Sequence, residues 1–282
     1  MKILITGANS YIGTSFEKWV TQYPDKYNVE TVDMISGIWR NKDFTSFDVV
    51  YHVAGIVHIK ETKKNADLYY RVNRDLVVET ATKAKAAGVK QFIFLSSMSV
   101  YGDVESGIIN KDTILKPKSN YGKSKLQAEE GITALADDNF KIAILRPPMI
   151  YGRGCKGNYQ TLRKYSLKLP FFPDIKNKRS MIYVDNLSEF VRVLIDDEVS
   201  GIFYPQNMEY MCTSEMVRLI AEAHGKQISL TKIFNPILKI AKINLVNKVF
   251  GDLVYETDID TYKNTKYCVV GMRQSIQASE KG

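Results

Sequence analysis

Short apolar runs and amphipathic stretches alternate along the first half of the chain. The apolar runs predict β-strands at 2–7, 28–33, 47–55, 90–97 and 141–147. Apolar residues at helical spacing between them predict helices at 15–23, 66–87 and 119–135. Strands such as FIFL and IAIL are apolar throughout, as expected for a sheet buried on both faces. This order of elements predicts an α/β fold with a doubly wound parallel sheet and helices on both faces.

The alternation loosens after residue 147, where prolines interrupt shorter elements, and we therefore expect a second, smaller lobe. The predicted first domain consists of 1–147 with parts of 179–205, and the lobe of 148–178 and 206–282. Within the lobe, 236–251 is apolar with interspersed lysines. That pattern suits either a packed helix or a helix lying on an anionic membrane surface.

Composition narrows the class of protein. The chain has 282 residues, of which 45% are hydrophobic and 25% charged, as in an ordinary globular protein. No apolar run approaches the roughly 18 residues that a membrane-spanning helix needs, and the first run is too short for a signal peptide. We therefore expect a cytoplasmic protein without stable membrane insertion. The three cysteines and three histidines lack metal-ligand spacing, so no metal site is predicted.

The chain carries a net charge of +8, with its positive residues spread along the sequence. This charge suits a polyanionic ligand, such as a dinucleotide or a nucleotide sugar. No motif of interleaved aromatic and basic residues accompanies it, which argues against nucleic acid as a partner.

The stretch ITGANSYIG, residues 5–13, has the outline of a phosphate-binding loop between the first strand and the first helix. Gly7 permits the tight turn and Gly13 permits close packing of helix on strand. Ser10 stands where the usual pattern has its middle glycine, and its hydroxyl can donate to a phosphate oxygen. Asp33 ends the second strand, where an acid accepts ribose hydroxyls and repels a 2′-phosphate. Together these residues predict a dinucleotide site that prefers NAD to NADP.

A second constellation combines a tyrosine, a lysine and serines. In YGKSK, Tyr121 and Lys125 stand four residues apart and share one helix face. A cation beside a phenol lowers the pKa of the phenol from about 10 toward neutrality, which makes tyrosine a usable general base or acid. The preceding FLSSMSVYG, residues 94–102, brings serine hydroxyls to the carboxyl end of a strand, where open parallel sheets bind ligands.

In this order the motifs resemble the extended short-chain dehydrogenase/reductase family, in its nucleotide-sugar epimerase and dehydratase branch. The resemblance covers nearly the whole chain and rests on TGANSYIG, Asp33, HVAG (52–55), Asn73, SSMSVYG, YGKSK, LRPPMIYG and RSMIYVDNL. It implies a Rossmann-type domain with a small C-terminal substrate-binding lobe, NAD as cofactor and a nucleotide sugar as substrate. It also implies a homodimer formed through the long helices at 66–87 and 119–135.

The resemblance assigns site residues by position. Ser97 would hydrogen-bond the reacting oxygen of the sugar, Tyr121 would be the general base, and Lys125 would bind the nicotinamide ribose and lower the tyrosine pKa. The cofactor-binding residues that it implies are Gly7, Ser10, Tyr11, Ile12, Gly13, Asp33, Ala54, Gly55 and Asn73, together with Tyr121 and Lys125. The implied substrate-binding residues are Ser97, Asn158 and Arg179.

Two departures from the family pattern restrict the function. Family dehydratases have Asp and Glu directly after the catalytic Ser or Thr, whereas this chain has Met98 and Ser99. Elimination of water needs that acid–base pair, so a 4,6-dehydratase is not expected. Met149 also replaces an asparagine that contacts substrate phosphate in many members, and Asn158 is the candidate for its role.

The leading interpretation is an NAD-dependent 4-epimerase of a UDP-sugar. Tyr121, as phenolate, would remove the C4 hydroxyl proton while C4 gives a hydride to NAD, and the hydride would return to the other face of the 4-keto sugar. The runner-up is an NAD(P)H-dependent 4-keto reductase of a nucleotide sugar in surface-polysaccharide biosynthesis, which uses the same residues and suits a short chain. A third alternative is a non-catalytic NAD-binding sensor, which has no need of Ser97, Tyr121 and Lys125 together.

Overall fold

The computed structural model describes residues 1–57, 59, 61–105, 107–233, 235, 249–259, 262 and 266–281. Of the basic apolar segment 236–251, residues 236–248 lie outside these ranges. In the described part of the chain, no helix combines the length and the apolar character needed to cross a membrane.

The chain divides into two compact units. The first comprises 1–103, 114–148 and 187–205, and the second comprises 104–113, 149–186 and 206–282. The segment 104–113, which the sequence analysis placed in the first domain, belongs to the second unit. The reason is a strand pairing: β5 (Ile108–Ile109) lies parallel to β12 (Val254–Tyr255), near the other end of the chain.

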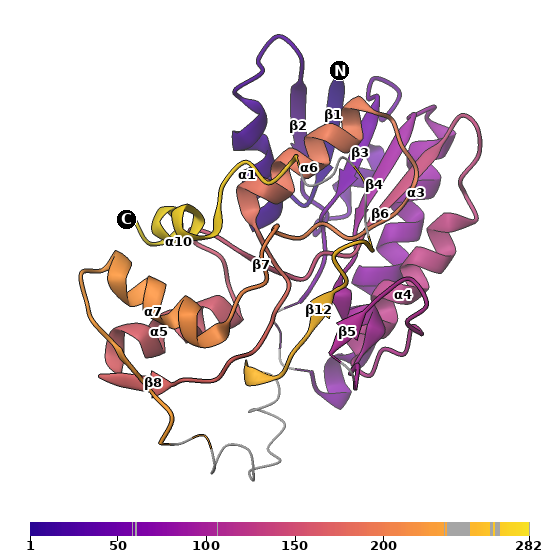
Figure 1. Ribbon diagram of the computed structural model, residues 1–282. Helices are drawn as coiled ribbons and strands as arrows, with labels where there is room; N and C mark the ends of the chain where they lie inside the picture. The colour runs from indigo at the N-terminus through magenta and orange to yellow at the C-terminus, as the bar shows by residue number, and fades with distance from the viewer. Residues whose placement is uncertain are drawn as a thin grey trace. The chain divides into compact units, whose positions relative to one another are not determined.

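The first unit is built on a six-stranded sheet in the order β10-β6-β4-β3-β1-β2, and every neighbouring pair is parallel (Figure 1). Its strands are β1 (Lys2–Thr6), β2 (Asn28–Val32), β3 (Val49–His52), β4 (Gln91–Leu95), β6 (Lys141–Leu145) and β10 (Gly201–Phe203). The chain runs from β1 outward to β2 and then returns to β3 on the other side of β1. This reversal is the switch point of a doubly wound sheet, which confirms the predicted Rossmann-type fold.

Helices cover both faces of this sheet. On one face, α3 (Leu76–Ala86) and α4 (Asn120–Thr133) bury alanine and aliphatic side chains against inward-facing residues of the central strands. On the opposite face, α1 (Tyr11–Val20) packs Phe16 edge-on against Tyr51 of β3. The side chains of successive strand residues point to opposite faces of the sheet. A strand that is apolar at every position therefore packs against the helices on both faces.

The helix expected at 66–87 is present but is not uniform. It consists of α2 (Ala66–Tyr70), a π-helical turn (Arg71–Asp75) and α3. A π turn inserts an extra residue and is frequent at functional sites. Here it contains Asn73, whose side chain is fully buried.

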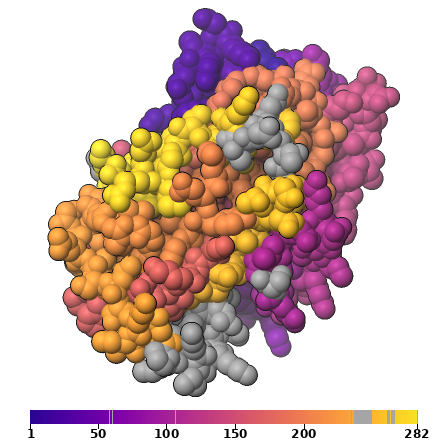
Figure 2. All heavy atoms as spheres, viewed as in Figure 1, coloured from indigo at the N-terminus to yellow at the C-terminus, as the bar shows by residue number. Residues whose placement is uncertain are grey.

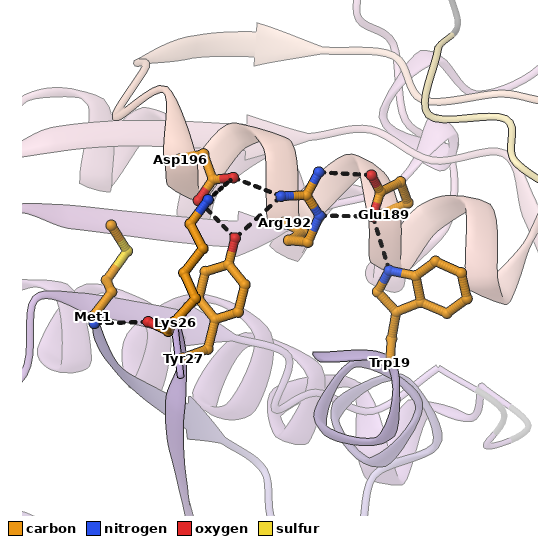
Figure 3. A network of polar contacts seen from close by, with 7 residues as sticks. All are labelled: Met1, Trp19, Lys26, Tyr27, Glu189, Arg192 and Asp196. Atoms are coloured by element: carbon orange, nitrogen blue, oxygen red, sulfur yellow. Dashed lines mark hydrogen bonds and ion pairs between the residues drawn. The ribbon is translucent and has the colours of Figure 1, made fainter. Parts of the chain in front are cut away.

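The segment that returns to the first unit at residue 187 is fastened by polar contacts from α6 (Val184–Asp196) (Figure 3). Arg192 bonds to Glu189 at 2.7 and 2.8 Å and to Asp196 at 2.6 Å. Trp19 of α1 donates to Glu189 at 2.9 Å, and Tyr27 donates to Asp196 at 2.6 Å. The network therefore ties α6 to α1 and to the chain that leads into β2.

The second unit contains three two-stranded parallel pairs and three described helices. Besides β5 and β12, the pairs are β7 (Met149–Tyr151) with β9 (Met181–Tyr183) and β8 (Phe171–Pro173) with β11 (Ser229–Thr231). The helices are α5 (Asn158–Lys168), α7 (Thr213–Ala223) and α10 (Met272–Glu280). The yellow atoms of α10 lie against the orange atoms of α7 (Figure 2).

One buried carboxylate joins these helices. The side chain of Glu280 is fully buried and accepts hydrogen bonds from Tyr159 and Arg163 of α5, at 2.7 and 2.6 Å. His224, which follows α7, contacts the same carboxylate at 2.7 Å. These contacts hold the end of α10 against α5 and α7 within the unit.

Candidate active site

The loop between β1 and α1 has the geometry of a phosphate cradle. Gly7 adopts a φ of 98°, which side-chain-bearing residues rarely reach, and a Cβ there would lie 3.1 Å from the backbone of Ala54. Its N–H and that of Ala8 both donate to the carbonyl of Val32, at 2.9 and 3.0 Å. The loop is thus pinned between the ends of β2 and β3, with the N-terminus of α1 directed at the same edge of the sheet.

Ser10, which stands in place of the middle glycine, is the N-cap of α1. Its hydroxyl oxygen accepts a hydrogen bond from the N–H of Gly13 at 3.1 Å. A Cβ on Gly13 would come within 2.7 Å of this hydroxyl and 3.0 Å of Ile5, so this position also requires a glycine. Tyr11 and Ile12 form the first turn of α1, where backbone N–H groups lack partners within the helix. The loop therefore fits a pyrophosphate, and the serine replaces glycine without loss of that fit.

Asp33 follows β2 at the edge of a surface cavity. Its carboxylate is exposed and accepts from the N–H groups of Ile35 and Ser36, both at 3.3 Å. The cavity has a volume of about 370 Å³ and is lined by Val32, Asp33, Ser36, Ile38, Trp39, Asn41 and Lys42. An acid beside an apolar cavity next to the phosphate loop fits the adenosine half of NAD.

Replacing Asp33 with Asn should weaken NAD binding by about 10–100-fold, because hydrogen bonds from the ribose to a charged acceptor are lost. It should also strengthen NADP binding, since the repulsion of a 2′-phosphate disappears. Quenching of Trp39 fluorescence by each dinucleotide measures both effects. Asp137→Asn is the matched control, because Asp137 also accepts two backbone N–H groups, at 2.8 and 2.9 Å, but precedes β6 and so lies at the amino ends of the strands, away from the site. Equal losses in the two variants would contradict the assignment of Asp33.

Ser97 and Tyr121 meet beyond the carboxyl end of β4. Ser97 is the N-cap of a short 3₁₀ turn (Met98–Tyr101), and its oxygen accepts from the N–H of Ser99 at 3.1 Å. It also donates to the hydroxyl of Ser99 at 3.1 Å. The Ser97 hydroxyl lies near that of Tyr121, which is in the first turn of α4, and lowers the pKa of the phenol. The predicted serine and tyrosine are therefore brought together.

Lys125 lies one turn further along α4 and is buried. Its Nζ donates to the carbonyl of Leu95 at 2.7 Å and lies 4.6 Å from the centre of the Phe94 ring. A Cβ on Gly55 would be 3.5 Å from this Nζ, so the glycine leaves room beside the ammonium. Burial lowers the pKa of Lys125 to about 7, although the carboxylate of Glu129 opposes the effect.

The pKa of Tyr121 differs from the sequence-based expectation. It is raised from its ordinary value because burial disfavours the charged phenolate; the nearby Ser97 hydroxyl lowers the pKa, and Tyr69 raises it. The expectation that Lys125 brings this pKa toward neutrality is therefore wrong for the structure as it stands. The tyrosine holds its proton at neutral pH.

Asn73 braces the turn that follows β3. Its Oδ1 accepts from the N–H of Ile56 at 2.9 Å, and its Nδ2 donates to the Ile56 carbonyl at 2.9 Å and to Ser124 at 3.4 Å. A Cβ on Gly55 would come within 3.0 Å of the same amide. The π turn thus points Asn73 at the junction of the Ala54–Gly55 turn with α4.

Glu61 is a further residue at this site, and it was not predicted from the sequence. Its carboxylate accepts from the N–H groups of Asn120 and Tyr121, at 3.1 and 3.0 Å, and so caps the helix that carries the candidate catalytic residues. The contact joins residues about 60 positions apart, and no local pattern announces it.

Asn158 and Arg179 belong to the second unit. Asn158 is exposed and begins α5. Arg179 is half-buried, donates to the carbonyl of Gly251 at 3.1 Å, and has a lowered pKa because of burial. Their assignment to the substrate stays a prediction. Among the described residues, no group of His, Cys, Asp and Glu is arranged to hold a metal ion.

The chain is similar in sequence to a known protein family and to curated proteins. The family model described as the NAD dependent epimerase/dehydratase family matches residues 3–204. A UDP-glucose 4-epimerase of Vibrio cholerae is 31% identical, over 93% of this chain and 89% of its own. The N-acetyl-alpha-D-glucosaminyl-diphospho-ditrans,octacis-undecaprenol 4-epimerase of Escherichia coli O157:H7 is 28% identical, over 71% of this chain and 64% of its own.

Two solved structures with different printed activities have folds similar to that of this chain. A UDP-glucuronic acid 4-epimerase from Bacillus cereus, in complex with UDP-glucuronic acid and NAD, has a TM-score of 0.75 at 21% identity, covering 99% of this chain and 98% of its own. A dTDP-4-dehydrorhamnose reductase from Clostridium acetobutylicum has a TM-score of 0.66 at 22% identity, covering 82% and 83%.

Proposed function

Because the chain belongs to the NAD-dependent epimerase/dehydratase family, we propose that it is a 4-epimerase of a UDP-sugar that works through a 4-keto intermediate. The family dependence on NAD agrees with the cofactor predicted from the glycine loop and Asp33. The observation that carries the proposal is the meeting of Ser97, Tyr121 and Lys125 beyond the carboxyl end of β4. The similarity to the epimerase of Vibrio cholerae supports it.

In this proposal the chain's own residues handle the proton. The Tyr121 hydroxyl exchanges a proton with the C4 hydroxyl of the sugar, and the nearby Ser97 hydroxyl donates a hydrogen bond to the same sugar oxygen. NAD, held by the glycine loop and Asp33, would supply the acceptance and return of the C4 hydride, and the positive charge of its oxidised ring would favour the phenolate form of the tyrosine. Lys125 lies beside Gly55, where its ammonium can donate to the ribose of the cofactor.

The raised pKa of Tyr121 favours a second candidate, a 4-keto reductase of a nucleotide sugar. A neutral phenol is the form that donates a proton to the oxygen of a ketone as hydride arrives at carbon. The epimerase needs the tyrosine in both protonation states in turn, whereas the reductase needs it to begin protonated. Both candidates use the same three residues.

A 4,6-dehydratase is not proposed. The two positions after Ser97 are Met98 and Ser99, which supply no group with a carboxylate's proton affinity. The two hydrogen bonds between Ser97 and Ser99 instead serve to orient the Ser97 hydroxyl.

We also propose a role for the second unit, an oligomeric state and a location. We assign the second unit, with Asn158 and Arg179, to the nucleotide sugar. A homodimer formed through the 66–86 helical run and α4, and a cytoplasmic location, complete the proposal.

The test begins with freshly purified protein, from which denaturation releases any bound nicotinamide cofactor for quantification. The epimerase predicts stoichiometric NAD and interconversion of C4 epimers without added cofactor, using UDP-glucose, UDP-N-acetylglucosamine and UDP-glucuronic acid as the panel. The reductase predicts protein without cofactor that oxidises added NADH or NADPH only with a 4-keto nucleotide sugar. Protein that binds NAD but turns over neither class of sugar would overturn both candidates.

A further inference from the structure

Three polar side chains follow one another along the face of α4 that meets the end of β4. Tyr121, Lys125 and Glu129 are spaced four residues apart and so lie on one face of the helix. Their neighbours are three consecutive residues at the carboxyl end of β4. Lys125 donates to the carbonyl of Leu95, Glu129 accepts from the hydroxyl of Ser96, and Tyr121 lies near Ser97. Two of the three side chains belong to the candidate active site, and Glu129 has no assigned role.

The carboxylate of Glu129 is held in a fixed geometry inside the protein. Arg146 donates to it from Nε, at 3.2 and 3.1 Å, and from Nη2, at 2.6 Å. The two side chains are only 4% and 5% exposed. Arg146 also donates to the Tyr101 hydroxyl at 2.9 Å, and Ser96 donates to the carboxylate. Every partner of the carboxylate is thus a hydrogen-bond donor, an arrangement that suits a carboxylate anion.

The surroundings of Lys125 give this carboxylate an electrostatic role. The amine is held by the Leu95 carbonyl and the Phe94 ring, which together replace only part of the water that burial removes. Burial and, to a lesser extent, the charge of Lys125 lower the pKa of His52 of β3 to about 3, so the imidazole is neutral and neither stabilises nor repels the ammonium as an ion. Glu129 supplies a negative charge that favours the ammonium.

We propose that Glu129 is a positioning residue of the active site, whose buried carboxylate keeps Lys125 in the ammonium form that binds the cofactor. Arg146 and Ser96 fix the carboxylate, and Glu129 acts on the cofactor only through Lys125. The proposal needs the NAD site but no particular sugar, so it can fail or succeed independently of the epimerase and reductase candidates.

The sign of the expected pH dependence follows from the lysine. Its pKa is lowered to about 7, so the ammonium form is lost as the pH rises through that value. NAD should therefore bind more tightly below about pH 7 than above it. Removing the Glu129 charge should lower the pKa of Lys125 further, because the carboxylate no longer favours the ammonium. At about pH 8 the ammonium fraction then falls about tenfold, whereas at about pH 5.5 the lysine remains mostly protonated in either protein.

The experiment measures NAD affinity by tryptophan fluorescence at about pH 5.5 and about pH 8 for the unmodified protein and Glu129→Gln. We expect Glu129→Gln to bind NAD about tenfold more weakly than the unmodified protein at the higher pH, and within about twofold of it at the lower pH. A merely structural role would weaken binding similarly at both pH values, and that result, or no change at either, would overturn the proposal. Lys125→Met should remove the pH dependence altogether.

Two further variants serve as controls for the effect of the Glu129 charge. Ser96→Ala removes one hydrogen bond to Glu129 but keeps its charge, so NAD affinity should follow the unmodified protein at both pH values. Where Glu129→Gln does not fold, the double variant Glu129→Leu/Arg146→Met removes both charges without leaving one unpaired. The double variant should show the same selective loss at the higher pH, and its absence would overturn the proposal.

Discussion

Tyr121→Phe should reduce turnover by about 10²–10⁴-fold, the usual contribution of a positioned acid or base, and leave NAD affinity within about twofold. The substitution removes one oxygen atom and keeps the ring. In the structure that oxygen lies near the Ser97 hydroxyl, at the place where the reacting oxygen of the sugar is expected. The effect should fall on kcat, because proton transfer is lost in the transition state while the cofactor site is intact.

The measurement is steady-state kinetics with the sugar identified by the panel, beside a fluorescence titration with NAD. Tyr70→Phe is the matched control: Tyr70 also presents its hydroxyl to the start of α4, bonding Asn120 at 3.3 Å, but lies outside the candidate site. It should keep full turnover. If Tyr121→Phe retained the protein's biological activity, the catalytic proposal would be wrong and the non-catalytic sensor would replace it.

The fold was largely predictable because its strongest signals are local. Apolar runs of four or five residues coincide with β1, β3, β4 and β6, which are buried on both faces and so have no polar alternation to obscure them. Strand β10 was not predicted, because it has only three residues, Gly201–Phe203, and two of them are exposed. The pairing of β5 with β12 was invisible for a different reason, since two-residue strands far apart in sequence carry no periodicity.

The π turn at 71–75 shows where helical periodicity is insufficient. Leu68, Val72 and Leu76 keep helical spacing across it, so the sequence predicts one regular helix. The extra residue in the turn changes only which side chain points inward, and here that side chain is Asn73. Such an irregularity depends on the hydrogen bonds that Asn73 makes to Ile56 and Ser124, which only the folded chain brings into reach.

The residues of the candidate site also differ in whether their roles depend on local motifs or on contacts distant in sequence. Ser97, Tyr121 and Lys125 could be found because each sits in a short motif. Glu61 and Glu129 could not, because their roles come from contacts with another part of the fold. The direction of the Tyr121 pKa was missed for a related reason: adjacency to a lysine is visible in sequence, whereas loss of solvent is a property of the packed site.

Arg146→Met should lower the free energy of unfolding by about 3–5 kcal/mol, the usual effect of removing one partner of a buried ion pair. Methionine fills much of the space of the arginine stem, so the main consequence is an unpaired carboxylate on Glu129. Urea denaturation at neutral pH, followed by far-ultraviolet circular dichroism, measures the change. Arg163→Met is the comparison, because Arg163 is 37% exposed and water can solvate the carboxylate of Glu280 once the arginine is gone. Arg163→Met should therefore lower the free energy of unfolding by less than Arg146→Met does.

The double variant Glu129→Leu/Arg146→Met separates the charge from the packing. Replacing both members of a buried pair with apolar side chains is often close to neutral, so most of the stability lost in Arg146→Met should return. The recovered protein would still lack the negative charge beside Lys125, and its NAD affinity at about pH 8 should stay low. Stability and cofactor binding would then change independently, which no purely structural role of the pair can produce. A cost below about 1 kcal/mol for Arg146→Met would instead mean that the carboxylate is neutral or hydrated, and Glu129 could not then act on Lys125 through its charge.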